Sequence, residues 1–167
     1  MRSQVNLAAC AAFCLILILY FPAKAQNKGP AVLQWRSFLP YNEVLGIATD
    51  GQTFFCATGS GFFTYNVQDG SLDAYSKVNG MHDVGLKSVG YDEKTGQAIL
   101  AYDNSNVDLF KDGQFRNIPD LKLAQVSGDK TIHSIVSRDG TAYLCSGIGR
   151  VLLNLEKTEV KETVVFY

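Results

Sequence analysis

The sequence has few of the residues from which catalytic and metal sites are usually built. Its only two histidines, His82 and His133, are 51 positions apart, and neither belongs to a cluster of metal-ligating residues. Zinc needs about four nitrogen, sulfur or oxygen ligands in a tetrahedral array. There is also no G-x-S-x-G elbow to expose a serine nucleophile and no G-x-G-x-x-G loop to cradle a phosphate. We therefore predict that the protein is not an enzyme, with no catalytic residue, no cofactor and no metal site.

The sequence has a single long hydrophobic run, Leu7–Phe21, which follows a basic start at Arg2. Ala23-Lys24-Ala25 then forms a small-x-small cleavage site, so we expect a secretory signal peptide at residues 1–25. The run is shorter than the about 20 apolar residues that span a bilayer comfortably. This favours secretion over a membrane anchor and predicts no transmembrane segment in the mature chain. Cys10 does not belong to a lipoprotein cleavage box, because most of the apolar run follows it.

Positive charge and cysteine are both scarce in the exported part of the chain. Arg2 and Lys24 leave with the signal, so 13 basic residues face 16 acidic ones and the net charge becomes −3. Without clustered Lys and Arg to neutralise phosphates, nucleic acid is not expected as a partner. Cys56 and Cys145 remain in a compartment that permits disulfides. Because each falls in an apolar, strand-like run, we expect two buried free thiols rather than a bridge.

The chain also lacks the sustained 3.6-residue apolar period of an amphipathic helix. Short runs rich in Val, Ile, Phe and Tyr recur instead, each closed by turn residues, so the sequence predicts strands throughout. Asp-Gly and Asn-Gly are the dipeptides that best tolerate tight hairpin turns. Five of them occur: Asp50-Gly51, Asp69-Gly70, Asn79-Gly80, Asp112-Gly113 and Asp139-Gly140. Most are flanked by apolar runs, which predicts an all-β chain of hairpins.

These turn signals recur with a fixed spacing. Gly51, Gly96 and Gly140 each follow the first strand of a unit and are 45 and 44 residues apart. Thr58-Gly59-Ser60-Gly61 recurs 88 residues later as Ser146-Gly147-Ile148-Gly149. A unit of four short strands that repeats every 40 to 45 residues has the size of one β-propeller blade.

The repeat predicts a partial β-propeller over residues 44–167, with about three four-stranded blades. We expect an N-terminal segment at residues 26–43 and blades at about 44–83, 84–128 and 129–167. Propellers typically have at least four blades, so three form an incomplete ring. We therefore expect the sequence to be the front part of a longer protein.

Two segments resemble a known family. One is Trp35-Arg36-Ser37-Phe38-Leu39-Pro40-Tyr41-Asn42, which is similar to the opening of the N-terminal propeller of PorZ-like proteins of the Bacteroidetes type IX secretion system. The other is Lys77-Val78-Asn79-Gly80-Met81-His82-Asp83-Val84-Gly85, followed by Ser88-Val89-Gly90-Tyr91-Asp92. It resembles that family's K-x-N-G-L-x-D-x-G linker and the I-x-Y strand after it. The hairpin from Ala57 to Tyr65 resembles a motif found widely in the propellers of two-component sensors.

The resemblance to PorZ-like proteins covers roughly residues 35–167 and implies a non-enzymatic scaffold in the periplasm or at the outer-membrane surface. It implies work with the sortase that processes secreted cargo, and attachment of that cargo to anionic lipopolysaccharide. PorZ-like chains also have a second propeller and a C-terminal β domain, which this sequence does not contain. Two alternatives stay open: the periplasmic sensor propeller of a hybrid two-component histidine kinase, and a secreted propeller enzyme that acts on polysaccharide.

The polar candidates for a ligand site are a loop and a histidine. The loop Asp103-Asn104-Ser105-Asn106-Val107-Asp108 has closely spaced oxygen donors, as calcium loops do. It lacks the glycine at the sixth position and the distant glutamate of an EF-hand, so we expect a solvated turn between strands. His82 lies next to Asp83, and we expect at most a hydrogen-bonded pair there.

The aromatic candidates fall into two groups. Trp35, Phe38 and Tyr41 precede the first repeat and could form a binding surface, but we expect them to pack the N-terminal segment against the ring. The second group lies at strand positions where large rings fill the gaps between blades: Tyr65, Tyr75, Tyr91, Tyr102 and Phe110. Such rings are more often core than ligand platform.

Overall fold

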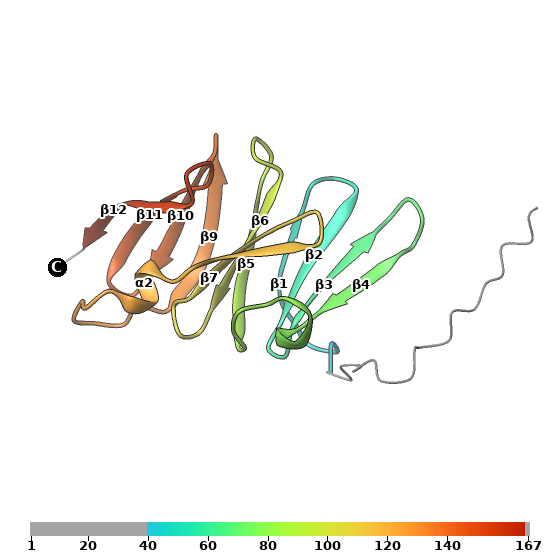
Figure 1. The fold of residues 1–167 in the computed structure, drawn as a ribbon, viewed down its shortest axis with the longest axis horizontal. Coiled ribbons are helices and arrows are strands. Elements are labelled where there is room, and N and C mark those ends of the chain that lie inside the picture. The colour runs from blue at the N-terminus through green and yellow to red at the C-terminus, as the bar shows by residue number, and fades with distance from the viewer. Residues whose placement is uncertain (1–39, 166–167) are drawn as a thin grey trace, which may run out of the picture. The chain divides into compact units, whose positions relative to one another are not determined.

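The computed structural model describes residues 40–165, which form three four-stranded antiparallel sheets (Figure 1). The first sheet consists of β1 (Val44–Thr49), β2 (Thr53–Thr58), β3 (Phe62–Asn66) and β4 (Leu72–Tyr75). The second consists of β5 (Leu86–Asp92), β6 (Gln97–Tyr102), β7 (Val107–Lys111) and β8 (Gln114–Ile118). The third consists of β9 (Ile132–Arg138), β10 (Thr141–Ser146), β11 (Gly149–Asn154) and β12 (Glu159–Val165). Within each sheet every strand pairs with the next one along the chain, which is the arrangement of a propeller blade.

The predicted signal peptide at residues 1–25 lies outside the described residues, as do Trp35 and Phe38. Tyr41 is described, and its ring lies edge-on to Phe63 with centroids 6.0 Å apart. Its hydroxyl donates a hydrogen bond to the Tyr75 carbonyl at 3.4 Å. Tyr41 therefore packs against the first sheet, as expected for the N-terminal segment.

The tight hairpins follow from the Asp-Gly pairs. Asp112 and Gly113 have φ angles of 50° and 77°, and Asp139 and Gly140 have 53° and 82°. Positive φ at both central residues is the type I′ geometry that matches the twist of paired strands. Asn79-Gly80 is different, because it ends the short 3₁₀ helix η1 (Lys77–Asn79) and joins no hairpin.

The connection between the second and third sheets contains one helical turn that the sequence pattern did not predict. This helix, α2 (Asp120–Leu123), follows Pro119 and buries Leu121. It is too short to show a 3.6-residue apolar period, which explains why the pattern of apolar residues did not indicate it. In the described residues, no helix is long and apolar enough to cross a membrane.

The core lies on both faces of the second sheet. Successive residues of a strand point to opposite faces, so β6 contributes to two clusters at once. Leu100 packs toward the first sheet, where Phe55 and Phe62 lie, and Ile99 packs toward the third, where Leu144 lies. Strand β5 contacts β1 on one side and β9 on the other, so the first strands of the three sheets are neighbours, as they are around a propeller axis.

Each first strand carries an irregularity at an equivalent place. The pairing of β1 with β2 shifts between Val44 and Gly46, and that of β5 with β6 shifts between Leu86 and Ser88. The pairing of β9 with β10 shifts at Ser146, near the same end of the strand. A bulge inserts one unpaired residue and bends the strand. The repeat seen in the sequence therefore extends to this detail of the backbone.

The expectation for the two thiols is half wrong. Cys56 is buried at 6% exposure, and its burial raises the pKa of the thiol. Cys145 is a free cysteine too, but it is exposed, because it shares with Tyr143 the face of β10 that points away from the second sheet. Its neighbour Leu144 is the residue that enters the core.

Four of the five strand aromatics lie in the contact between the first two sheets. Tyr102 and Phe110 are buried there, and Tyr75 and Tyr91 pack against the same cluster. The expectation is wrong for Tyr65, which is 38% exposed. Tyr65 follows Thr64 in β3, so its side chain points to the opposite face of the sheet, away from the second sheet.

Candidate functional site

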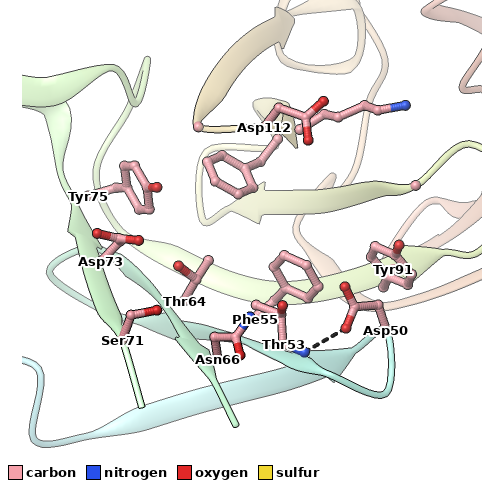
Figure 2. A pocket seen from close by; sticks show the side chains of 14 residues that line it. Asp50, Thr53, Phe55, Thr64, Asn66, Ser71, Asp73, Tyr75, Tyr91 and Asp112 are labelled. Carbon is pink, nitrogen blue, oxygen red and sulfur yellow. Dashed lines mark hydrogen bonds between the residues drawn. The ribbon is translucent and has the colours of Figure 1, made fainter. Parts of the chain in front are cut away.

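A cleft opens between the first and second sheets (Figure 2). It has a volume of about 450 Å³ and lies where the β1–β2, β3–β4, β5–β6 and β7–β8 turns meet. Figure 1 shows the β7–β8 hairpin reaching across toward β2, and Asp112 and Gly113 at its tip line the cleft together with residues of the first sheet. The walls of the cleft therefore belong to two different repeats.

The floor of the cleft is aromatic. The rings of Phe55 and Tyr91 are stacked with centroids 5.1 Å apart and an interplanar angle of 12°. Tyr75 and Phe110 meet edge-to-face with centroids 5.0 Å apart. Phe62 contacts Phe55, Tyr75 and Phe110 from within the core. These contacts hold the rings in place, so the floor does not depend on a ligand for its shape.

Three carboxylates, those of Asp50, Asp73 and Asp112, line the cleft around this floor. Asp50 Oδ1 accepts hydrogen bonds from the backbone nitrogens of Gln52 at 2.8 Å and Thr53 at 2.6 Å. Between residues 40 and 165, none of the three carboxylates forms an ion pair. They therefore leave negative charge at the surface of the cleft.

Lys111, which also lines the cleft, is held by a backbone group. Lys111 Nζ donates a hydrogen bond to the Thr95 carbonyl at 2.8 Å, near the β5–β6 turn. This contact positions the ammonium group beside the turn. It does not bring the lysine within ion-pair distance of any carboxylate in the described part of the chain.

The two tyrosines report the electrostatics of the cleft. Burial raises the pKa of Tyr91, and the carboxylates of Asp50, Glu93, Asp92 and Asp112 raise it further. Burial also raises the pKa of Tyr75, with the Asp73 carboxylate as the next cause. Ionising either phenol would place another negative charge near existing ones. Burial and the nearby carboxylates therefore both favour the neutral form of these phenols.

A second polar region lies at the opposite end of the second sheet, where the linker before β5 meets the β6–β7 loop. Asp108 is fully buried and accepts a hydrogen bond from the Tyr102 hydroxyl at 2.5 Å. It also accepts bonds from Asn117 Nδ2 at 2.9 Å and from the His82 backbone nitrogen at 3.0 Å, and His82 Nδ1 lies 3.0 Å from it. His82 is therefore paired with Asp108 and not with its neighbour Asp83, because β7 brings Asp108 beneath the linker.

Asp83 has partners of its own in this region. Its Oδ2 atom accepts hydrogen bonds from Lys122 Nζ and Asn104 Nδ2, both at 2.6 Å. Burial alone would raise the pKa of Asp83, but these hydrogen bonds outweigh it and lower the pKa to about 2. Asp83 therefore stays charged and ties the linker to the β6–β7 loop and to α2.

The loop at residues 103–108 is only partly the solvated turn that we expected, because Asp103 and Asn104 are exposed but the residues after them are not. Ser105, Asn106 and Asp108 are all buried, and Asn106 donates to Asp83 at 3.4 Å. The closely spaced oxygens and amides thus bind other parts of the chain. In residues 40–165, no group of three or more His, Cys, Asp or Glu side chains is placed to hold a metal ion.

The cleft was not predicted from the sequence, although its residues were noticed for other reasons. Asp50 and Asp112 belong to the Asp-Gly turns, and Tyr75, Tyr91 and Phe110 lie at strand positions where rings fill the gap between blades. One signal could have joined them. In a blade of four sequentially paired strands, the first and third turns lie at the same end, so their acidic residues come close to the aromatic gap.

Three sheets of this topology, with their first strands adjacent, define the chain as part of a β-propeller. The family model described as the N-terminal β-propeller domain of PorZ, of the type IX secretion system, matches residues 54–166. The chain belongs to this family. A comparison with curated proteins finds no match.

Solved structures show the same fold. PorZ, described as an essential bacterial surface component of the type IX secretion system of Porphyromonas gingivalis, matches with a TM-score of 0.63 and 17% identity, over 72% of this chain and 16% of PorZ. The extracellular domain of the putative hybrid two-component system BT4673 from B. thetaiotaomicron matches with a TM-score of 0.62 and 19% identity. This match covers 80% of this chain and 18% of the BT4673 chain. Citrobacter koseri AztD matches with a TM-score of 0.53 and 17% identity, over 74% of this chain and 34% of AztD. The chain thus spans about a sixth of the length of PorZ.

Proposed function

We propose that this chain is a non-enzymatic propeller scaffold of the type IX secretion system, which assists sortase-dependent processing of cargo and its attachment to anionic lipopolysaccharide. The observation that carries the proposal is the family match over residues 54–166. PorZ of P. gingivalis is described as a surface component of this system, which supports a site of action at the outer membrane. Export by the signal peptide at residues 1–25, and blades at about 44–83, 84–128 and 129–167, are part of the proposal.

The geometry supports a scaffold because the cleft is open and its acidic side chains line an aromatic floor. Interface centres are enriched in aromatic residues, and Tyr in particular presents a large apolar face together with a polar tip. The carboxylates of Asp50, Asp73 and Asp112 that line the cleft make it a poor surface for anionic lipopolysaccharide. A protein is therefore the partner that fits this part of the molecule, and lipopolysaccharide would be bound elsewhere.

The test is deletion of the gene in the organism that carries it, followed by analysis of secreted cargo. The proposal expects cargo that keeps its sorting signal and lacks lipopolysaccharide, with normal processing restored by the intact gene. Affinity capture with the tagged full-length protein should recover the sortase or another secretion component. Normally processed and attached cargo in the deletion strain would contradict the proposal.

A second candidate is the sensor propeller of a hybrid two-component histidine kinase. It is favoured by the similarity to the BT4673 extracellular domain, which covers 80% of this chain. The two proposals differ in what the gene encodes after Tyr167. A second propeller and a C-terminal β domain support the secretion scaffold, whereas a transmembrane helix followed by kinase motifs supports the sensor.

A further inference from the structure

We propose that the cleft between the first two sheets binds a lysine or arginine side chain presented by a partner protein. The inference rests on the proposed scaffold function only for the source of the cation, because the cleft itself belongs entirely to this chain. It specifies which chemical group of the partner is recognised and which end of the blades recognises it.

The cleft is already formed without a ligand. Phe55 and Phe110 are buried to 7% and 5% exposure, and both belong to the core cluster that joins the two sheets. Tyr75 and Tyr91 pack against that cluster at the edge of the cleft. A rigid floor does not have to be ordered when a ligand binds, so little conformational entropy is lost.

Aromatic rings and carboxylates without ion pairs occur together in the cleft. Cations are attracted to the faces of aromatic rings when they lie within about 6 Å of the centroid. Asp73 and Asp112 lie around these rings and form no ion pair in the described residues (Figure 2). A bound ammonium or guanidinium group would gain from both interactions and would relieve the repulsion among the carboxylates.

The lining of the cleft favours an organic cation over a metal ion. The carboxylates are spread around an aromatic floor, and no three acidic, His or Cys side chains among residues 40–165 are grouped to hold a metal ion. Metal ions of the Ca²⁺ type need several oxygen ligands at once. An organic cation instead needs charge and apolar surface together. Lys and Arg side chains carry a long apolar stem behind the charge, which can lie against the rings.

The cleft is bordered by hairpin turns, and a partner surface that rests on these turns could insert one side chain without entering the core. The volume of about 450 Å³ leaves room for a long side chain together with water. An open cleft of this kind can bind a side chain that stays attached to a partner protein.

The direct test is binding of a blocked pentalysine peptide to the full protein, measured by isothermal titration calorimetry at low and high salt. A blocked pentaglutamate peptide and maltopentaose are the comparison probes. We expect pentalysine alone to bind, with an affinity that falls as salt rises because partly exposed charges are screened. Equal binding of maltopentaose would assign the cleft to neutral sugars and overturn the inference, and so would the absence of any pentalysine binding.

The site is tested by the double variant Asp73→Asn/Asp112→Asn. Asn tolerates positive φ as Asp does, so the turn at Asp112 should keep its shape. The matched control is Asp103→Asn/Asp120→Asn, which removes two exposed charges at the opposite end of the second sheet. We expect the cleft variant to weaken pentalysine binding about tenfold and the control to change it less than about twofold. Equal weakening by both would indicate attraction by net charge and refute the site.

The same variants separate this inference from the scaffold proposal. If the cleft variant loses pentalysine but supports normal cargo processing, the cation site is real and the scaffold works through another surface. If neither the unmodified protein nor the cleft variant binds pentalysine while deletion of the gene still blocks processing, the cation site is refuted and the scaffold proposal stands. Circular dichroism of each variant confirms that it is folded.

Discussion

Carboxylates lie at one end of the second sheet and in the cleft beside its other end, and their surroundings differ in the two places. At one end Asp108 is fully buried with at least three hydrogen-bond donors, and Asp83 accepts from Lys122 and Asn104. At the other end Asp73 and Asp112 are exposed and, within residues 40–165, form no ion pair. Burying a charge is costly unless it is paired, so Asp108 and Asp83, with their partners, stabilise the fold. Exposed, unpaired charges cost little and stay available for a partner.

The largest effect should come from removing the most deeply buried of these carboxylates. Asp108→Ala leaves the Tyr102 hydroxyl and the Asn117 amide without their acceptor. We expect the free energy of unfolding to fall by about 3 kcal/mol, measured by urea denaturation. Asp73→Ala is the control at the cleft end and should change stability by less than about 0.5 kcal/mol. An equal loss of unfolding free energy in Asp108→Ala and Asp73→Ala would show that the carboxylates at the two ends do not differ in their contribution to stability.

A smaller effect should follow from removing one donor to the same carboxylate. Tyr102→Phe keeps the buried ring and deletes only the hydroxyl that donates to Asp108 at 2.5 Å. Hydrogen bonds to charged groups contribute about 1.5–3 kcal/mol, so we expect a loss near the lower end, about 1.5 kcal/mol. Tyr65→Phe removes a hydroxyl from an exposed ring and should be nearly neutral. A neutral Tyr102→Phe variant would argue against a structural role for the bond.

The ion pair of Asp83 should make stability depend on pH in a defined window. The pKa of Asp83 is lowered from 3.8 to about 2, so the unfolded chain takes up this proton before the folded one does. The stabilisation is complete above pH 3.8 and is lost as the pH falls through about 2.

Lys122→Met removes the cation of this pair and tests that window. Because the Lys122 side chain is 39% exposed and therefore screened by solvent, we expect a loss of only about 1 kcal/mol at pH 6. The difference from the unmodified protein should narrow at pH 3, in urea denaturation at both pH values. Lys87→Met, on an exposed position of β5, should show no such change with pH. A constant difference would mean that Lys122 acts through packing alone.

The smallest effect on stability is expected at the cleft, where the effect on binding should be largest. Asp73→Asn/Asp112→Asn removes two exposed charges that contribute no ion pair among the described residues. We expect the free energy of unfolding to change by less than about 0.5 kcal/mol, or to rise slightly as repulsion is relieved. Thermal unfolding measures this directly. A marked loss of stability would mean that Asp73 and Asp112 stabilise the fold as Asp108 and Asp83 do, and would remove the contrast between the two ends.

Local pattern was enough to predict the strands and their turns. The Asp112-Gly113 and Asp139-Gly140 hairpins have the positive φ angles that these dipeptides tolerate. The period of about 45 residues predicted three four-stranded units, and the structure has three such sheets. These features depend on residues that are close in the sequence, which is why they can be read from it.

Contacts between distant residues were predicted poorly. The sequence allowed at most a hydrogen-bonded pair of His82 with its neighbour Asp83, but the partner of His82 is Asp108, which is 26 residues away. Cys145 was expected in the core, and its exposure was decided by which face of β10 meets the second sheet. In the polar loop at residues 103–108, Asn106 and Asp108 are buried with partners from other parts of the chain, and polarity alone does not show whether such partners lie nearby in space.

By itself, the sequence determined the β-propeller repeat, the hairpin turns and the resemblance to PorZ, because spacing and turn chemistry are local properties. Only the tertiary structure decided what the acidic residues do. The packing of one repeat on the next brings Asp50, Asp73 and Asp112 around Phe55, Tyr75 and Tyr91, and it buries Asp108 among its donors. The same carboxyl group is a structural anchor or a free charge according to the groups that folding places around it.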